Sequence, residues 1–173
     1  LSFPFPEYRK GQRQLAVAVY RAIQRESRVF CQAPTGIGKT ISTLFPAVKA
    51  MGEGLTEKIF YLTAKTITRQ AAEQAFSLLR RQPLRLKTVT LTAKDKICFL
   101  EERRCNPVDC PYADGHFDRV NSVLFAMLQK EDAFSREIIE KYAREGRVCP
   151  FELGLDLTLW ADCIICDYNY VFD

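Results

Sequence analysis

The fold is decided at residues 29–40, which read VFCQAPTGIGKT. We expect the apolar start of this stretch, residues 29–32, to form a short strand. Two glycines follow at alternate positions, and a helix is predicted from residue 39 to about residue 50. A strand, a glycine-rich loop and a helix in this order form the arrangement in which a P-loop surrounds a phosphate group.

The residues of this loop fit phosphate binding. Gly36 and Gly38 admit backbone angles that other residues resist, so that successive N–H groups can point at phosphate oxygens. The following helix adds the positive end of its dipole. We expect Lys39 to reach the β- and γ-phosphates of ATP and the Thr40 hydroxyl to coordinate Mg²⁺, which makes these two the catalytic candidates. The predicted nucleotide-binding residues of the loop are Ala33, Pro34, Thr35, Gly36, Ile37, Gly38, Lys39 and Thr40, with Ala33 standing where the strict motif has glycine.

Helices and strands are predicted to alternate on both sides of the loop. Residues 11–27 have the apolar spacing of an amphipathic helix. A strand is expected at residues 58–62, a helix at 68–79 and a strand at 88–91. This alternation predicts an α/β fold with a parallel sheet.

The pattern changes between residues 95 and 149. This segment holds four cysteines and two helical stretches, near residues 117–130 and 134–144, and no strand is evident there. A fully apolar strand returns at residues 162–166, as in the middle of a parallel sheet. We therefore predict an α/β domain with an insertion, divided into residues 1–94, 95–150 and 151–173.

The four cysteines of the insertion are candidate metal ligands. Cys98, Cys105, Cys110 and Cys149 have six, four and 38 residues between them, which matches neither common ferredoxin spacing. The total of seven cysteines is odd, and no secretory signal precedes them, so we expect a reducing, cytoplasmic location. On these residues alone, the four thiolates can hold either Zn²⁺ or an iron–sulfur cluster.

We expect structural rather than functional roles for the remaining cysteines, the histidine and several aromatic residues. Cys163 and Cys166 point to opposite faces of the predicted strand and are expected to be buried apolar residues, like Cys31. His116 is expected at the surface. Trp160 and the aromatic residues of 168–172 are expected in the core, and Asp167 is not assigned to Mg²⁺ although it ends an apolar strand.

The net charge of +4 is unevenly distributed. Residues 80–104 contain eight basic and three acidic side chains. Such a segment is typical of a path for a polyanion, although a solvated surface loop would have the same composition. No apolar run is long enough to span a bilayer, so we expect no membrane partner.

Four further stretches resemble the XPD and DinG branch of the superfamily-two DNA helicases. One precedes the P-loop, one follows the second predicted strand, and two close the cysteine segment. They are Phe3-Pro4 with Tyr8-Arg9-Lys10-Gly11-Gln12, Thr63-Ala64-Lys65-Thr66 with Gln70, Val148-Cys149-Pro150-Phe151-Glu152-Leu153, and Asp167-Tyr168-Asn169-Tyr170.

This resemblance implies an ATP-dependent DNA helicase of which the chain is an N-terminal fragment. The fold would be a partial RecA-like sheet of motor domain one with a helical iron–sulfur insertion, so that the four cysteines would hold a [4Fe–4S] cluster. Arg9 and Gln12 would contact the adenine. Lys65, Thr66 and Lys94 would contact single-stranded DNA, or a junction of duplex and single strand. The rest of the helicase chain would supply the other groups of the ATPase site, so we expect the fragment to be inactive alone.

Two other classes of protein remain as alternatives. The first is a P-loop ATPase or kinase of small molecules with a zinc-bearing lid. The second is a non-catalytic DNA-binding or redox-sensing module with a vestigial P-loop. The basic segment argues against the first alternative, and the intact Gly38-Lys39-Thr40 sequence argues against the second.

Overall fold

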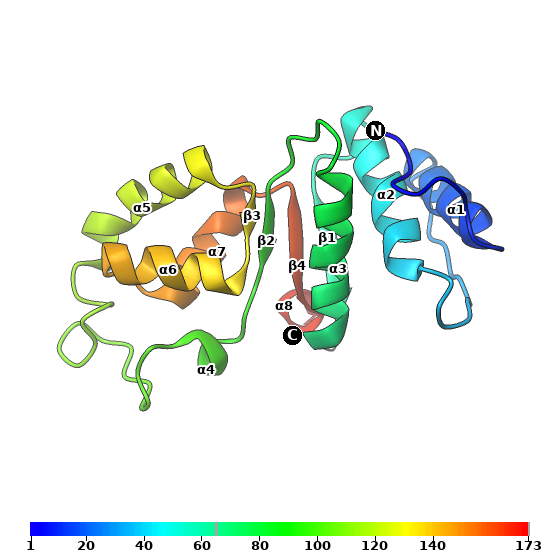
Figure 1. Cartoon of the computed structure of the whole chain (residues 1–173). Helices are drawn as coiled ribbons and strands as arrows, with labels where there is room; N and C mark the ends of the chain where they lie inside the picture. Colours follow the sequence, from blue (N-terminus) through cyan, green and yellow to red (C-terminus); the bar gives the residue numbers. More distant parts are fainter. Residues whose placement is uncertain (65, 173) are drawn as a thin grey trace. The chain divides into compact units, whose positions relative to one another are not determined.

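The computed structural model describes residues 1–64 and 66–172, which fall into two units, Leu1–Arg85 and Leu86–Asp173. The first unit contains α1 (Gln12–Gln24), α2 (Lys39–Gly52), β1 (Ile59–Thr63) and α3 (Thr66–Leu79) (Figure 1). The predicted helices and the strand after the P-loop are therefore confirmed, with ends shifted by a few residues.

The first unit is held together by apolar faces of its helices. Helix α1 packs on α2, and α2 packs on α3. Leu15 and Ala22 of α1 are buried, as the amphipathic pattern predicted, and Leu44 and Val48 of α2 are buried too. On α3 one face is buried, and it consists of Ala72, Ala75, Phe76 and Leu79.

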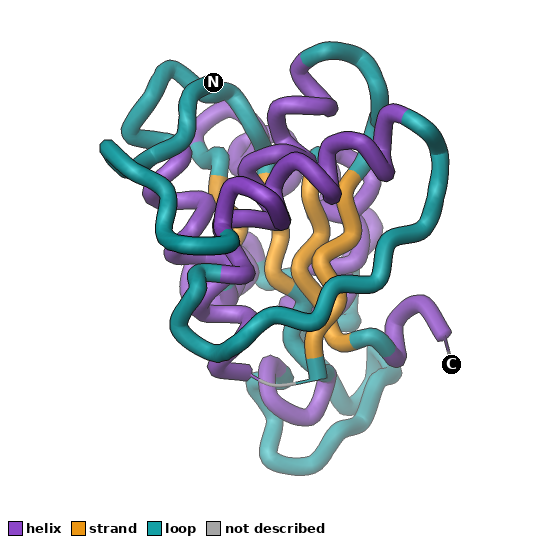
Figure 2. The backbone as a smooth tube through the Cα atoms, turned by 90° about the vertical axis from the view of Figure 1, so that its right-hand side faces the viewer, coloured by secondary structure: helices purple, strands orange, loops and turns teal. Residues whose placement is uncertain are grey.

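The second unit contains a parallel sheet and a group of helices. Its elements are β2 (Thr88–Thr90), α4 (Lys94–Ile97), α5 (His116–Lys130), β3 (Ala133–Phe134), α6 (Arg136–Gly146), α7 (Pro150–Trp160), β4 (Cys163–Asp167) and α8 (Asn169–Phe172). Strand β2 lies between β3 and β4 and is parallel to both, with Val89 opposite Phe134 on one side and Ile164 on the other (strands are orange in Figure 2). The expected parallel α/β fold is thus confirmed.

Helices α5, α6 and α7 pack against one another and form the apolar centre of the second unit (Figure 1). Ser135 caps α6 by accepting a hydrogen bond from the Ile138 N–H, and Pro150 starts α7 at the position where its missing N–H costs nothing. Met127, Leu153 and other large side chains are almost completely buried between the helices. No described helix is both long enough and apolar enough to cross a membrane.

The strand expected at residues 29–32 is not formed. The backbone there is irregular, Cys31 is exposed rather than buried, and 95% of Phe30 is accessible to solvent. The physical reason is that an apolar segment becomes a strand only when another strand accepts and donates its backbone hydrogen bonds. Helix α2 forms at the predicted place without that strand.

Three further expectations were wrong. The cysteine segment does contain a strand, β3, which was missed because its two residues are too short to show an alternating pattern. Trp160 and Phe172 are 60% and 75% exposed, so the aromatic residues near the end of the chain are not in a core. His116 is buried rather than at the surface, and its ring accepts a hydrogen bond from the backbone N–H of Cys149. Cys163 and Cys166 are buried, as expected.

Candidate functional site

The P-loop has the backbone geometry that its glycines predicted. Gly36 and Gly38 have φ angles of +81° and +82°, in the left-handed region that favours glycine. Gly38 is the residue before α2, and no side chain among the described residues caps the start of that helix. The first N–H groups of α2 and the positive end of its dipole are therefore available to an anion.

Lys39 and Thr40 lie at the start of α2, where side chains can reach a bound phosphate. The Lys39 ammonium group donates to the carbonyl oxygens of Ala33 and Pro34 at 3.1 and 3.0 Å, so it lies across the loop. The Tyr61 hydroxyl, on β1, donates to the Thr40 hydroxyl oxygen at 3.4 Å. The other predicted loop residues are arranged around these two, with Thr35 exposed and Ile37 half-buried.

Arg9 and Gln12, the predicted adenine contacts, are joined to the P-loop. The Arg9 guanidinium donates to the Gly36 carbonyl at 2.6 Å, and the Arg9 N–H donates to the Gln12 side-chain oxygen at 3.0 Å. Gln12 is only 3% exposed. Both residues line a cavity of about 490 Å³ that also includes Gly38 and Ile41. The structure thus places the predicted base-binding and phosphate-binding residues of this unit side by side.

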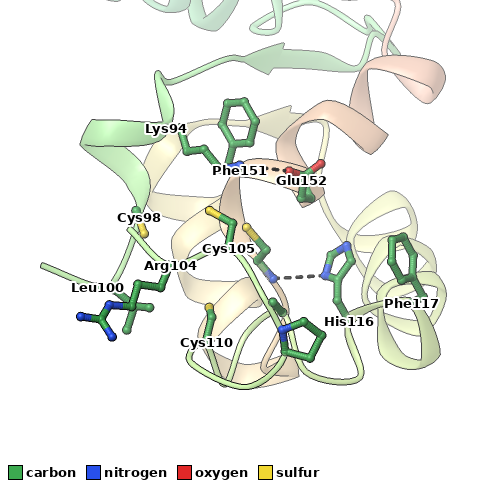
Figure 3. A pocket seen from close by; sticks show the side chains of 13 residues that line it. Lys94, Cys98, Leu100, Arg104, Cys105, Cys110, His116, Phe117, Phe151 and Glu152 are labelled. Carbon is green, nitrogen blue, oxygen red and sulfur yellow. Dashed lines mark hydrogen bonds and ion pairs between the residues drawn. The ribbon is translucent and has the colours of Figure 1, made fainter. Parts of the chain in front are cut away.

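The four candidate cysteine ligands line a single cavity in the second unit. Cys98, Cys105, Cys110 and Cys149 come from separate turns and from the residue before α7, and the cavity measures about 240 Å³ (Figure 3). Burial raises the pKa of the Cys149 thiol above its usual value, an effect that hydrogen bonds from the first turn of α7 partly oppose.

The cysteines surround the cavity but do not converge on one point. Among the described residues, no three His, Cys, Asp or Glu side chains lie close enough together to hold a single metal ion. One Zn²⁺ needs four ligand atoms within about 2.0–2.3 Å of its centre. A cluster of several irons and sulfides is larger and takes its thiolates from around its periphery. Thiolates are ligands in both kinds of site, so the donor set is compatible with either group.

Lys94, a predicted DNA contact, lies at the edge of the same cavity (Figure 3). Its ammonium group is 3.5 Å from the Glu152 carboxylate and 4.8 Å from the centre of the Phe151 ring. Burial acts to lower the pKa of Lys94, but the interactions with Cys105 and Glu152 outweigh it, and the pKa is raised. A cation is thus held beside the cysteines.

Two protein-family models match this chain. The family model of the DEAD/DEAH box helicases matches residues 10–108, and that of the DEAD_2 family matches residues 65–173. Each match covers more than half of the chain. The chain belongs to the DEAD/DEAH box helicase family.

Relatives of this helicase chain are consistent with its family and fold. It is 37% identical over 46 residues to a probable ATP-dependent helicase of Methanocaldococcus jannaschii, an alignment that covers 27% of this chain and 7% of the relative. A solved XPD helicase has the same fold, with a TM-score of 0.66 and 18% identity over 97% of this chain and 29% of that one. The predicted resemblance to XPD-type helicases is confirmed, and the chain spans less than a third of the XPD helicase it matches.

Not every predicted site residue of the helicase chain can be placed. Lys65 lies outside the described residues, and Thr66 is placed only as the first residue of α3. Asp167 ends β4 and accepts a hydrogen bond from the Asn169 N–H at 3.1 Å, so its carboxylate caps the turn that follows.

One residue near the site was missed by sequence analysis. His116 lines the cysteine cavity and is 4% exposed. Its position directly after Gly115, at the start of a predicted helix and six residues beyond Cys110, was the available signal.

Proposed function

We propose that this chain is the nucleotide-binding part of motor domain one of an ATP-dependent DNA helicase. The observation that supports the proposal most directly is that Arg9 and Gln12 contact the P-loop and line one cavity with it. Two left-handed glycines lie at the start of α2, and Arg9 and Gln12 lie beside them at the edge of one cavity. Phosphate and base of one nucleotide would therefore find their partners next to each other.

The proposed roles follow from the chemistry of each side chain. The Lys39 ammonium would leave the loop carbonyls for the β- and γ-phosphates, which are stronger acceptors because they are charged. The Thr40 hydroxyl would coordinate Mg²⁺. Gln12 offers an amide that can both donate to and accept from the adenine edge, and Arg9 supports it by holding its oxygen.

The test is ATP hydrolysis by the full-length protein with and without single-stranded DNA. We expect DNA to stimulate phosphate release, and Lys39→Ala to abolish it. Lys49→Ala is the matched control, since Lys49 is exposed on the same helix and pairs with Glu53 on the surface. Stimulation by a small-molecule acceptor instead of DNA would favour the ATPase or kinase alternative. Undetectable nucleotide binding would favour the non-catalytic module.

We also propose that Cys98, Cys105, Cys110 and Cys149 hold a [4Fe–4S] cluster. The single cavity that all four line supports this. The group would be structural: it would cross-link a segment of turns, residues 98–115, that buries little surface of its own. Anaerobically purified full-length protein should contain iron and sulfide at about four each per chain. Stoichiometric zinc without sulfide would contradict the proposal.

The proposed nucleic-acid partner is single-stranded DNA or its junction with duplex. Lys94 is a cation beside the cysteine cavity, and it lies in the segment 80–104, in which basic residues outnumber acidic ones. Both facts support a DNA path along this segment. Lys65 and Thr66 are proposed as further contacts to the DNA backbone. The seven free cysteines fit a reducing compartment such as the cytoplasm.

The 173-residue chain by itself is proposed to bind nucleotide without hydrolysing it. Its sequence contains no Asp-Glu-Ala-His motif, and Asp167 is engaged in a local turn. Phosphoryl transfer needs a second acid on Mg²⁺ and an oriented water, which the rest of the helicase would supply. A phosphate-release assay on the chain tests this. Turnover that is lost on Asp167→Asn would show that the chain is a complete ATPase.

A further inference from the structure

His116 is buried in the wall of the cysteine cavity and contacts one of the cysteines through the backbone. Its Nδ1 accepts a hydrogen bond from the Cys149 N–H at 3.2 Å (Figure 3). A ring nitrogen accepts a hydrogen bond through its lone pair, so Nδ1 is the acceptor in this contact. The Phe117 ring packs edge-on against it, with ring centres 5.2 Å apart. The imidazole is therefore fixed in one orientation.

Backbone hydrogen bonds continue this contact to Cys110. The Ala113 N–H donates to the Cys110 carbonyl at 3.0 Å, and the His116 N–H donates to the Ala113 carbonyl at 3.2 Å. The His116 side chain then accepts from Cys149. Two cysteines with 38 residues between them are thus connected through one short turn and one imidazole.

Arg119, one turn further along α5, makes a second connection between the same segments. Its guanidinium donates to the Asp114 carbonyl at 2.5 Å, to the Arg147 carbonyl at 2.6 Å and to the Gly146 carbonyl at 3.2 Å. Arg147 has a φ of +52° and ends α6, so the chain changes direction there, two residues before Cys149. The turn after Cys110 and the turn before Cys149 are therefore held together by two side chains of α5.

The contacts next to Cys105 lie at the surface. Cys105 is exposed. Beside it, Arg104 pairs with Glu102 at 3.0 Å and with Asp109 at 3.9 Å, and all three side chains are largely accessible to solvent. Ion pairs of this kind contribute about 0–1 kcal/mol each. Cys105 is thus held less firmly than Cys110 and Cys149.

We propose that His116 is a positioning residue of the cysteine site. It fixes the backbone of Cys149 next to Cys110, so that these two form a preformed part of the site, which the exposed Cys105 joins when the cluster binds. The inference rests on the proposed [4Fe–4S] function of these cysteines. Outer residues that orient a ligand typically change metal affinity about 10- to 100-fold when they are removed.

The test compares three variants in the full-length protein. His116→Phe and His116→Leu fill the site without an acceptor, whereas His116→Asn keeps an acceptor oxygen close to the position of Nδ1. Each protein is purified anaerobically, and the loss of cluster absorbance is followed in excess iron chelator. We expect the Phe and Leu variants to lose the cluster about 10-fold faster or more, and the Asn variant to behave like the unsubstituted protein. Equal rates in all four proteins, or equal losses in all three variants, would overturn the proposal.

A second measurement does not depend on the cluster. In metal-free protein, mass spectrometry follows alkylation of each cysteine, with the fully buried Cys163 as the report of intact folding. Cys105 should react fast in every protein, and Cys149 should become fast only in the Phe and Leu variants. If Cys149 were still alkylated slowly in the Phe and Leu variants, the proposal would be overturned. Fast alkylation of Cys163 in both variants would also overturn it, since His116 would then stabilise the whole unit rather than position Cys149. If the expected alkylation pattern were found but iron and sulfide were absent, only the proposed cluster would be contradicted, and the positioning role of His116 would stand.

Discussion

Substitution of Gly38 by alanine should have two effects on the P-loop: backbone strain at residue 38 and displacement of the Gln12 side chain. Gly38 has a φ of +82°, and a Cβ at this position would lie 2.6 Å from Nε2 of Gln12. That distance is too short for any stable contact, so the Gln12 amide must move. The amide is 3% exposed, and its oxygen accepts from the Arg9 N–H. The added methyl group therefore strains the backbone and displaces a candidate adenine contact.

The magnitude follows from these two costs. A non-glycine residue in the left-handed region costs about 1–2 kcal/mol. Loss of the hydrogen bond between Arg9 and Gln12 adds about 1 kcal/mol, so we expect Gly38→Ala to lower the free energy of unfolding by about 2–3 kcal/mol. Gly54→Ala is the matched control: its φ is +77°, but nothing lies within 4 Å of the new Cβ, so only the backbone cost applies.

The assays are denaturant unfolding and equilibrium binding of ATP, both on the full-length protein. ATP affinity should fall about 10-fold in Gly38→Ala, which corresponds to about 1.4 kcal/mol, and should stay unchanged in Gly54→Ala. The reasoning is refuted if both variants unfold with the same free energy and bind ATP equally well. In that case Gln12 would not be held against Gly38 as the geometry indicates.

Three further predictions concern other parts of the chain. Lys39→Ala should weaken ATP binding in an equilibrium titration, whereas Lys49→Ala should not; equal weakening would contradict the role of the loop. Reversal of Lys94 and Lys96 to Glu should reduce single-stranded DNA affinity and its salt dependence in fluorescence titrations, compared with the same reversal at exposed Lys130 and Lys141, and no difference would mean that the basic segment is only a solvated surface. Ser135→Ala should destabilise the protein by about 1 kcal/mol near neutral pH, because it removes the cap of α6. The Ser135 hydroxyl also donates to Glu137 and lowers the pKa of that carboxyl group. The stability that this contact contributes is therefore present above the ordinary pKa of Glu and is lost as the pH falls through the lowered pKa. If Ser135→Ala lowered the free energy of unfolding equally at every pH, the contact would be contradicted.

The P-loop could be predicted because its requirements are local. Left-handed angles at Gly36 and Gly38 and the start of a helix at Lys39 depend on residues within one short stretch. The parallel sheet of the second unit was predictable for a similar reason, since β4 is a continuous apolar run of residues. Strand β3 was not, because two residues form a strand only through the neighbour with which they pair.

The positions of single polar and aromatic side chains were harder to predict. His116 is buried because the Cys149 N–H, far away in the sequence, supplies the hydrogen bond that a buried imidazole needs. Tryptophan is a large, mostly apolar residue that is often buried, but Trp160 lies at the exposed end of α7. In both cases the outcome depends on what the folded chain brings to that position, and periodicity does not contain that information.

The exposed segment ahead of the P-loop has a consequence for the behaviour of the chain in solution. Val29 is 43% and Phe30 is 95% exposed, and residues 29–32 form no strand. Apolar backbone that pairs with nothing is a template for β-pairing with a second molecule. Concentrated solutions of the chain should therefore self-associate through this segment, and replacement of Phe30 by serine should reduce the association without changing nucleotide binding.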